Sequence, residues 1–276
     1  MSDRLNDPDR LERLFARCED ESRAALVGYL TAGDPDVATS EKLIMDLAAQ
    51  VDVLEIGMPF SDPMADGPVI QAASERALAA GTHIRDIFAI ASKVRAAHPG
   101  IGIILMGYAN VPYTIGFESF AKQASDAGVD GVLIVDIPAE ESYVFEEALT
   151  KYGLHRILLL SPTSSDVRIK LASKAASGFI YYVSLTGITG AEMGETTAVA
   201  KQVENIRKFS DLPICVGFGV KTAEQAKAVA AFADGVVVGS HFVSKIPANI
   251  SNENEMVSSL HKAANNMRGA MKKGSA

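Results

Sequence analysis

The sequence has only two cysteines, Cys18 and Cys215, far apart and without a CxxC pair. Neither a disulfide framework nor a cysteine-based metal site is therefore expected. Cys215, within an apolar run, is interpreted as a small buried hydrophobic residue. The five histidines are scattered, and the sequence has no HExxH motif, so the chain is not predicted to hold a metal ion.

Positive charge is also scarce, because 26 Lys plus Arg stand against 34 Asp plus Glu and give a formal net charge of −8. Without an overall cationic field, neither nucleic acid nor an anionic membrane surface is an expected partner. The longest uncharged stretch, Pro99–Phe117, is interrupted by several glycines and Pro112, which excludes a continuous membrane helix. The first 23 residues are dense in both signs of charge and lack the apolar core of a signal peptide, which predicts a cytoplasmic protein.

Short apolar runs bounded by Gly, Pro or Asp recur along the 276 residues. Most are continuously apolar, as expected of strands in a parallel sheet that is covered on both faces. The eight runs are Ala25–Leu30, Val51–Ile56, Ile101–Met106, Gly131–Val135, Arg156–Leu160, Phe179–Val183, Ile214–Val216 and Gly235–Val238.

Segments with helical spacing of apolar residues lie between these runs, and Thr222 is predicted to cap one of them. Additional helices are predicted at Leu11–Cys18 and Ile84–Ala97. Asp52, Asp130 and Asp234 each stand where a helix leads into a strand, which we interpret as a stability feature of the N-terminal end of the sheet.

Eight strand–helix units over 276 residues give about 30 residues per unit, which is the size expected of a (β/α)₈ TIM barrel. The alternative is an open doubly wound sheet, but the first strand is followed by Tyr29–Pro35, without a glycine-rich phosphate loop. No linker divides the chain. The sequence therefore predicts one barrel domain over residues 1–276, with extra N-terminal and inserted helices.

Catalytic residues of such barrels lie at the C-terminal ends of the strands. Glu55 is the second-to-last residue of the apolar run Val51–Ile56, where a carboxylate is costly unless it is paired, protonated or functional. If Glu55 points inward, burial should raise its pKa into the range useful to a general acid or base. The alternative is a structural ion pair at the sheet edge.

The loop that follows, Gly57–Pro68, presents Asp62 and Asp66 on a backbone stiffened by three prolines. Asp66 could lie above Glu55 at the barrel mouth, or either aspartate could only cap the helix that begins near Pro68. Asp136, at the end of the fourth run, is a third carboxylate at the same end of the barrel, and it could simply terminate the strand.

Glycines follow the sixth, seventh and eighth runs, in Gly187–Gly190, Gly217–Gly219 and Gly239–Ser240. Their backbone N–H groups, with a short helix that opens at Ser240, predict a site for a phosphate-bearing substrate that is bound chiefly by neutral donors. The loop after the sixth run continues through Ala191–Thr197 and is predicted to be a mobile lid, with plain disorder as the alternative. No strand ends in lysine, which argues against a lysine-dependent aldolase.

The motif Leu54–Gln71 closely resembles the signature of the tryptophan synthase alpha chain family. Further segments, spread over roughly residues 10–265, support the resemblance. They are Gly33–Pro35, Met106–Asn110, Val135–Pro138, Gly187–Gly190, Gly217–Gly219 and Gly239–Ser240. The resemblance implies a barrel that cleaves indole-3-glycerol phosphate into indole and glyceraldehyde 3-phosphate. It also implies a partner β chain that carries pyridoxal phosphate in an α₂β₂ heterotetramer, with no cofactor in this chain.

The resemblance also assigns roles to residues. Glu55 and Asp66 fall on the family's catalytic positions, and Leu185 stands where some members carry arginine. The implied substrate-binding residues are Tyr29, Met106, Leu133, Tyr181, Thr189 and Phe218, and the implied phosphate-binding residues are Gly190, Gly219, Gly239 and Ser240. The expected partner surface comprises Asp62, Pro63, Tyr108 and Asn110.

Two other functions remain as alternatives to the lyase. One is an isomerase or epimerase of sugar phosphates, although such epimerases usually need metal-ligand histidines at strand ends. The other is a regulatory subunit that binds a phosphorylated ligand without catalysis, which the presence of both carboxylates disfavours.

Overall fold

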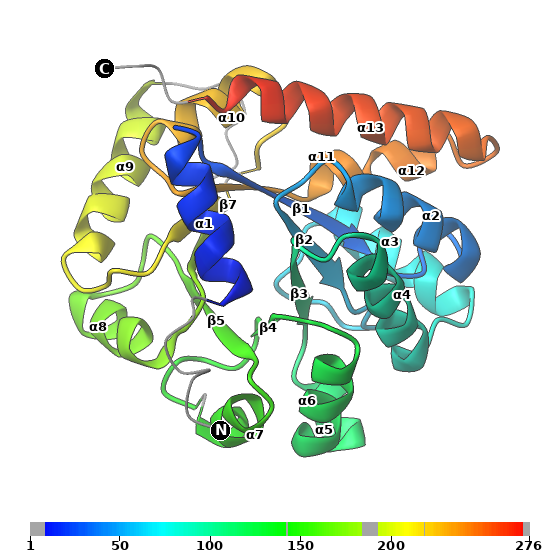
Figure 1. Cartoon of the computed structure of the whole chain (residues 1–276), viewed down its shortest axis with the longest axis horizontal. Helices are drawn as coiled ribbons and strands as arrows, with labels where there is room; N and C mark the ends of the chain where they lie inside the picture. The colour runs from blue at the N-terminus through cyan, green and yellow to red at the C-terminus, as the bar shows by residue number, and fades with distance from the viewer. Residues whose placement is uncertain (1–8, 142, 184–192, 218, 273–276) are drawn as a thin grey trace.

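The structure, a computed structural model, describes residues 9–141, 143–183, 193–217 and 219–272, with residues 193–195 described by their backbone alone. Within these ranges, eight parallel strands pair in chain order and close into a barrel, with β1 paired to both β2 and β8 (Figure 1). The strands are β1 (Ala25–Thr31), β2 (Val53–Gly57), β3 (Gly102–Gly107), β4 (Gly131–Ile134), β5 (His155–Leu160), β6 (Ile180–Val183), β7 (Ile214–Gly217) and β8 (Gly235–Val238).

The predicted (β/α)₈ barrel is thus confirmed, and each predicted run matches its strand to within two residues. The doubly wound alternative is wrong, because such a sheet has two open edges whereas β1 and β8 pair here. None of the described helices combines the length and apolar character needed to cross a bilayer.

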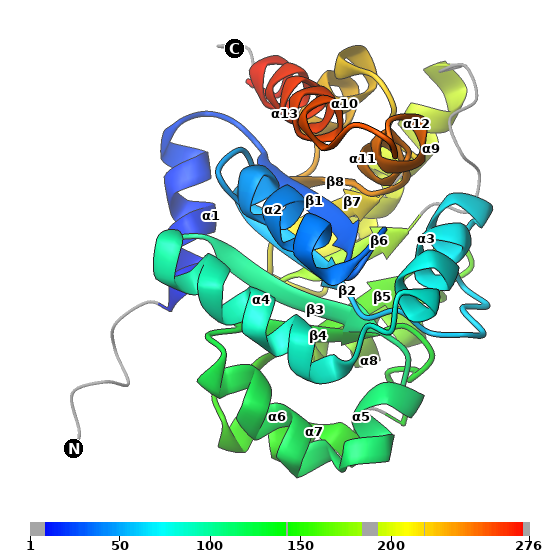
Figure 2. The same cartoon turned by 90° about the vertical axis from the view of Figure 1, so that its right-hand side faces the viewer.

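Helices surround the strands on the outside of the barrel, as the side view in Figure 2 shows. They are α1 (Arg10–Asp20), α2 (Val37–Ala48), α3 (Pro68–Ala79), α4 (Ile84–Ala97), α5 (Asn110–Ile115), α6 (Phe117–Asp126), α7 (Tyr143–Lys151), α8 (Asp166–Ala175), α9 (Met193–Arg207), α10 (Ala223–Ala230), α11 (Ser240–Val243), α12 (Lys245–Ala248) and α13 (Glu253–Ala270). The extra helices α1 and α4 and the Thr222 cap of α10 confirm the predictions made from spacing.

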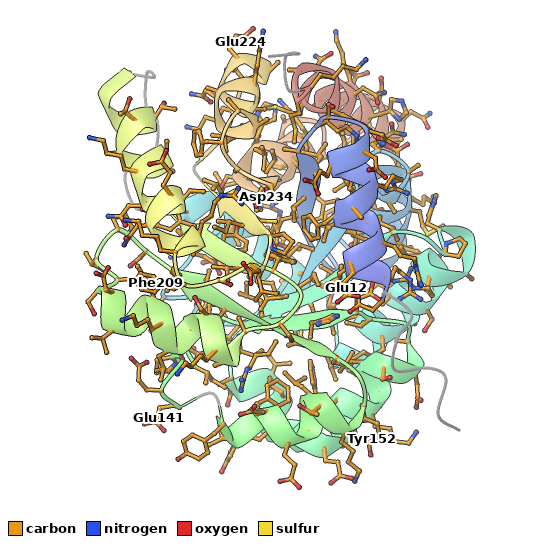
Figure 3. All side chains as sticks on the ribbon, turned by 60° about the vertical axis from the view of Figure 1, so that its left-hand side comes forward. Glu12, Glu141, Tyr152, Phe209, Glu224 and Asp234 are labelled. Atoms are coloured by element: carbon orange, nitrogen blue, oxygen red, sulfur yellow. The ribbon has the colours of Figure 1, made fainter. Side chains whose placement is uncertain are left out.

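Side chains alternate between two apolar layers along each strand, because successive strand residues point to opposite faces. Val27 and Val53 belong to a cluster inside the barrel, whereas Leu26 and Leu54 pack in the layer between strands and helices. Helix α1 closes one end of the interior, since its buried stripe of Leu11, Leu14, Phe15 and Cys18 belongs to the inner cluster. Figure 3 shows α1 across the same end of the barrel as Asp234.

Three aspartates fasten this N-terminal end of the barrel in the same way. Asp52, Asp130 and Asp234 stand just before β2, β4 and β8, and each accepts a hydrogen bond from a backbone N–H at the start of the preceding strand. The donors are Leu26, Ile103 and Ile214, at 3.0, 2.7 and 2.9 Å respectively. Each carboxylate also pairs with arginine, namely Arg23 for Asp52, Arg10 and Arg95 for Asp130, and Arg207 for Asp234. The interpretation of these aspartates as structural is confirmed.

Asp52 is the most deeply buried of the three, at 1% exposed. Burial favours its neutral form, but hydrogen bonds from Arg23 and Leu26 and the charges of Arg23 and Arg268 outweigh burial and hold the Asp52 pKa below its ordinary value. Arg23 is itself 7% exposed, so the two charges depend on each other.

Replacing Asp52 by Ala should destabilise the fold by about 3–5 kcal/mol, because Arg23 would keep a buried charge without its main partner. Urea unfolding measures this change in the free energy of unfolding. The matched control is Asp126→Ala, which removes an exposed i,i+4 pair with Lys122 and should cost below about 0.5 kcal/mol. Equal losses in the two variants would contradict the structural role of Asp52.

Candidate active site

Glu55 points into the barrel. It lies two residues after Val53 of the inner cluster, between Leu54 and Ile56 of the outer layer, and it is 1% exposed. In the strand register it stands between Tyr29 of β1 and Ile104 of β3. The alternative of an ion pair at the sheet edge is wrong, because the barrel is closed and none of the ion pairs among the described residues includes Glu55.

The Glu55 carboxyl is buried without compensation. Within the described part of the chain, neither of its oxygens has a hydrogen-bond partner. Burial, with a smaller contribution from the negative charge of Asp66, raises the Glu55 pKa to about 8. At neutral pH the side chain is therefore mostly protonated, and it can give a proton to a bound molecule and take one back.

Asp66 is held at the same end of the barrel by three contacts. Its N–H donates to the carbonyl of Pro63, its own carbonyl accepts from the Gln71 side chain, and its carboxylate Oδ2 accepts from the Tyr108 hydroxyl at 2.8 Å. Burial raises the Asp66 pKa, and the Tyr108 hydrogen bond opposes that rise. Asp66 thus has a fixed carboxylate near the Glu55 charge.

The alternative that these loop aspartates cap a helix is wrong. Helix α3 is preceded by Gly67 and begins with Pro68, and the N–H groups of Ile70 and Gln71 donate to the carbonyl of Gly67 rather than to either aspartate. Asp62 is exposed and accepts a hydrogen bond from Ser61 at 2.6 Å. Asp136 has the structural role that the sequence left open, since it accepts the N–H of Ala109 at 2.7 Å and joins the loops after β3 and β4.

Two tyrosines flank these carboxyl groups, and two glycines make room for them. A Cβ on Gly57 would lie 2.1 Å from the Tyr29 hydroxyl oxygen, and a Cβ on Gly217 would lie 2.8 Å from the Tyr181 ring. Burial, together with the charges of Asp66 and Glu55, raises the pKa of both tyrosines. Both hydroxyls therefore remain neutral, and the rings form polar-edged walls of the site.

Apolar side chains complete the inner wall. Leu133 is fully buried in the inner cluster, while Met106 is half-buried against it. Three further half-buried residues pack on the same cluster and were missed by the sequence analysis: Val135, Leu159 and Val183. Strand alternation was the signal that could have found them, because each stands two positions after an inward-facing residue.

Part of the predicted phosphate site can be described. Gly219 has a left-handed φ of +63°, and Gly239 precedes the short helix α11, which begins at Ser240. Gly190, Thr189 and Phe218 lie outside the described residues. The sequence analysis missed three basic residues near Ser240. Burial is the main cause that lowers the pKa of His241, and the charges of Lys245 and Lys221 lower it further, so these two lysines lie close to His241.

Only part of the predicted lid lies within the described residues. Residues 184–192, including Leu185, lie outside the described residues. The prediction of a loop from Met193 to Thr197 is wrong, because these residues form the first turns of α9.

A family model described as "Tryptophan synthase alpha chain" matches residues 15–272. The chain belongs to the tryptophan synthase alpha chain family. The family's alpha chain from Zymomonas mobilis is 46% identical over 263 residues, which are 95% of this chain and 96% of the relative. That from Geobacter sulfurreducens is 51% identical over 235 residues, 85% of this chain and 89% of the relative.

Solved structures of the tryptophan synthase alpha chain family have the same fold. Tryptophan synthase subunit alpha from Legionella pneumophila superposes with a TM-score of 0.88 at 37% identity, over 96% of this chain and 98% of that chain. A chain of the M. tuberculosis tryptophan synthase in its open form gives a TM-score of 0.86 at 31% identity, over 97% of this chain and 100% of that chain.

In this member of the tryptophan synthase alpha chain family, the predicted partner surface divides into exposed and buried residues. Asp62 and Asn110 are exposed and Pro63 is half-buried, whereas Tyr108 is 3% exposed. The loops after β2 and β3 lead into α3 and α5, which lie at the same end of the barrel in Figure 2. Tyr108 therefore lies behind this surface, and its hydroxyl is directed at Asp66.

The Glu55→Gln variant should be more stable than the parent protein at neutral pH. The pKa of Glu55 is about 8 in the folded chain and 4.5 is its ordinary value. Between these two pH values the carboxyl is ionised in the unfolded chain but protonated in the folded one, so it destabilises the fold increasingly as the pH rises from about 4.5 to 8. Glutamine removes this penalty, with a gain of about 1–3 kcal/mol at pH 7.

Urea unfolding of both proteins at pH 4.5 and pH 7 measures the difference. The gain should be close to zero at the lower pH and largest at the higher one. Glu118→Gln is the control, because hydrogen bonds from Lys151 and Tyr152 lower the pKa of this exposed residue, and its replacement should bring no such gain. A pH-independent difference for Glu55→Gln would show that Glu55 is not protonated by burial.

Proposed function

We propose that this chain cleaves indole-3-glycerol phosphate into indole and glyceraldehyde 3-phosphate, as the alpha subunit of tryptophan synthase. The observation that carries the proposal is the carboxyl of Glu55, which is 1% exposed inside the barrel, and whose pKa is raised to about 8 by burial and by the charge of Asp66. Family membership supplies the substrate, and the two carboxyl groups supply the means to cleave it.

The reaction breaks the bond between indole C3 and the hydroxyl-bearing carbon of the glycerol chain. Glu55 gives its proton to C3, which places positive charge on the ring nitrogen. Its carboxylate then takes the proton of the glycerol hydroxyl while the electron pair of the breaking bond returns to the ring. The aldehyde forms, the indole regains its aromatic system, and Glu55 ends protonated as it began.

Asp66 stabilises the charge that develops in the first of these steps. A carboxylate that accepts a hydrogen bond from the indole N–H is attracted more strongly as the nitrogen becomes positive, so it favours the transition state over the bound substrate. The Tyr108 hydroxyl occupies Oδ2 of Asp66. Oδ1 is then the oxygen that would accept from the indole.

Binding of the phosphate at the far end of the substrate orients the bond that breaks. Gly219, Gly239 and Ser240 would donate backbone and hydroxyl groups, with Gly190 contributed from the loop after β6. Lys221 and Lys245 are near enough to His241 of α11 for their charges to lower its pKa, and they would help to attract the dianion in a chain with a net charge of −8. The indole would be surrounded by Tyr29, Tyr181 and Met106. The half-buried residues Val135, Leu159 and Val183 would complete the wall, with Thr189 and Phe218 as further proposed contacts.

The proposed partner is a tryptophan synthase β chain in an α₂β₂ heterotetramer, and pyridoxal phosphate would belong to that partner. Cleavage as written uses only side chains of this chain. A cytoplasmic location is also part of the proposal, because a phosphorylated substrate does not cross membranes unaided and must be cleaved where it is made.

Glu55→Gln should lower the rate of indole release by about 10²–10⁴-fold, because the general acid and base is lost. Asp66→Asn should lower it by about 10²–10³-fold, because the amide keeps the shape without the charge. Indole release from the purified chain and from the complex with the β chain measures both effects, and substrate affinity should change little.

The parent protein should also lose activity above pH 8 as Glu55 ionises, and the rate of indole release as a function of pH measures this loss.

Indole release close to normal in Glu55→Gln or in Asp66→Asn would refute the proposed function. A regulatory subunit would release no indole even as the parent protein, which separates that alternative.

Charge reversal by Asp62→Lys should weaken association with the β chain at least about tenfold, if the loop after β2 forms part of the interface. Titration calorimetry with purified β chain measures the affinity. Asp211→Lys is the matched control, because this exposed aspartate lies at the opposite end of the barrel, just before β7. Equal affinities for the two variants would place the interface elsewhere.

A further inference from the structure

Tyr108 is the first residue after β3, yet it contacts the catalytic loop that follows β2 at three points. Its hydroxyl donates to Asp66 Oδ2 at 2.8 Å and accepts from the backbone N–H of Ala65 at 3.0 Å. Its ring stacks on Phe60, with the ring centroids 5.2 Å apart and the planes 29° apart. The side chain is 3% exposed, so these contacts are shielded from water.

The two hydrogen bonds of the Tyr108 hydroxyl fix the direction of its proton. A phenol has one O–H to donate, and here its oxygen accepts from the Ala65 amide, which can only donate. The hydroxyl proton is therefore directed at Asp66, whose Oδ2 must be an acceptor.

Tyr108 is itself anchored from two sides. The backbone N–H of Ala109 donates to the Asp136 carboxylate after β4, and the N–H of Met58 donates to the carbonyl of Met106 in β3. The backbone on either side of Tyr108 is therefore hydrogen-bonded to the loop after β2 and to the loop after β4. A change in the position of Tyr108 would therefore move Asp66, and the rigid barrel resists such a change.

The other groups near Asp66 do not favour its charge. Glu55 on β2 carries the same sign when ionised, and Tyr29 on β1 and Tyr181 on β6 are neutral. Asp136 lies beyond Tyr108 and is also acidic. Among the described residues, the Tyr108 hydrogen bond is the interaction that opposes protonation of Asp66.

We infer that Tyr108 is a positioning residue for the cleavage reaction, whose hydroxyl holds the Asp66 side chain by Oδ2 and leaves its other oxygen directed at the indole N–H. This inference rests on the proposed function. It gives Tyr108 a role in the active site, in place of the partner surface on which the sequence analysis placed it.

The test is Tyr108→Phe, which keeps the ring and its stacking on Phe60. At pH 7 we expect kcat to fall about 10- to 100-fold, the range for losing a hydrogen bond to a charged group, while KM changes less than about threefold. The acidic limb of the kcat profile should move to higher pH, because Asp66 without the hydroxyl is protonated more readily. Ionisation of the substrate phosphate contributes equally to both profiles, so the difference between them reports Asp66.

The matched control is Tyr152→Phe, which removes another tyrosine hydrogen bond to a carboxylate, that from Tyr152 to Glu118 at 3.2 Å on the surface. It should leave kcat and the pH profile unchanged. Thermal unfolding of both variants shows whether each is folded at the assay temperature. An acidic limb that does not move in folded Tyr108→Phe would overturn the inference.

A double-mutant cycle on the affinity for indole, measured by calorimetry, tests whether Tyr108 acts through Asp66. Tyr108→Phe should weaken indole binding in the parent protein and have no effect in the Asp66→Asn variant. Equal effects in the two backgrounds would also overturn the inference. Failure of the proposed function has a different signature, since Asp66→Asn would then release indole at the parent rate.

Discussion

A carboxyl group enclosed in an apolar barrel, with no hydrogen-bond partner among the described residues, is the constraint on which the site depends. Glu55 stays protonated at neutral pH because water is kept from it by its neighbours in the inner cluster and by Tyr29 in register beside it. Such an arrangement opposes folding and persists because the closed barrel fixes the strand on which Glu55 stands. The stability of the fold and the chemistry of the site are thus in opposition at this residue.

The two ends of the barrel divide these tasks. At the N-terminal end, carboxylates are paired with arginines and with backbone N–H groups of neighbouring strands, as at Asp52 and Asp130. At the C-terminal end, and among the residues that the structure describes, Glu55 has no such partner and the carboxylate of Asp66 accepts a hydrogen bond from the Tyr108 hydroxyl. The same residue type thus fastens the structure at one end and carries out chemistry at the other, according to whether a cation lies within reach.

Predictions from sequence succeeded where the signal is local or periodic. Eight apolar runs predicted the eight strands, the apolar stripe at Leu11–Cys18 predicted α1 with nearly the right ends, and Thr222 was predicted as the cap that begins α10. Sequence left a role open or assigned it wrongly where a residue had two local roles to choose from. For the aspartates after β2, helix capping and a place at the barrel mouth were both open, and the structure excludes capping because Gly67 precedes α3. The residues from Met193 to Thr197 were predicted to lie in a lid but form a helix. Tyr108 was predicted to lie on the partner surface, but its side chain is 3% exposed and its ring stacks on Phe60.

The sequence alone determined the barrel, because the number of strand–helix units is a property of one chain segment after another, and it marked Glu55 as a candidate without deciding which way it points. It also marked the loop that carries Asp66. Only the tertiary structure decided which groups surround these carboxyls. The contact of Tyr108 with Asp66 joins residues 42 positions apart along the chain. The half-buried residues Val135, Leu159 and Val183 likewise come from the ends of separate strands. Such contacts exist only after closure of the barrel brings the ends of different strands to one mouth.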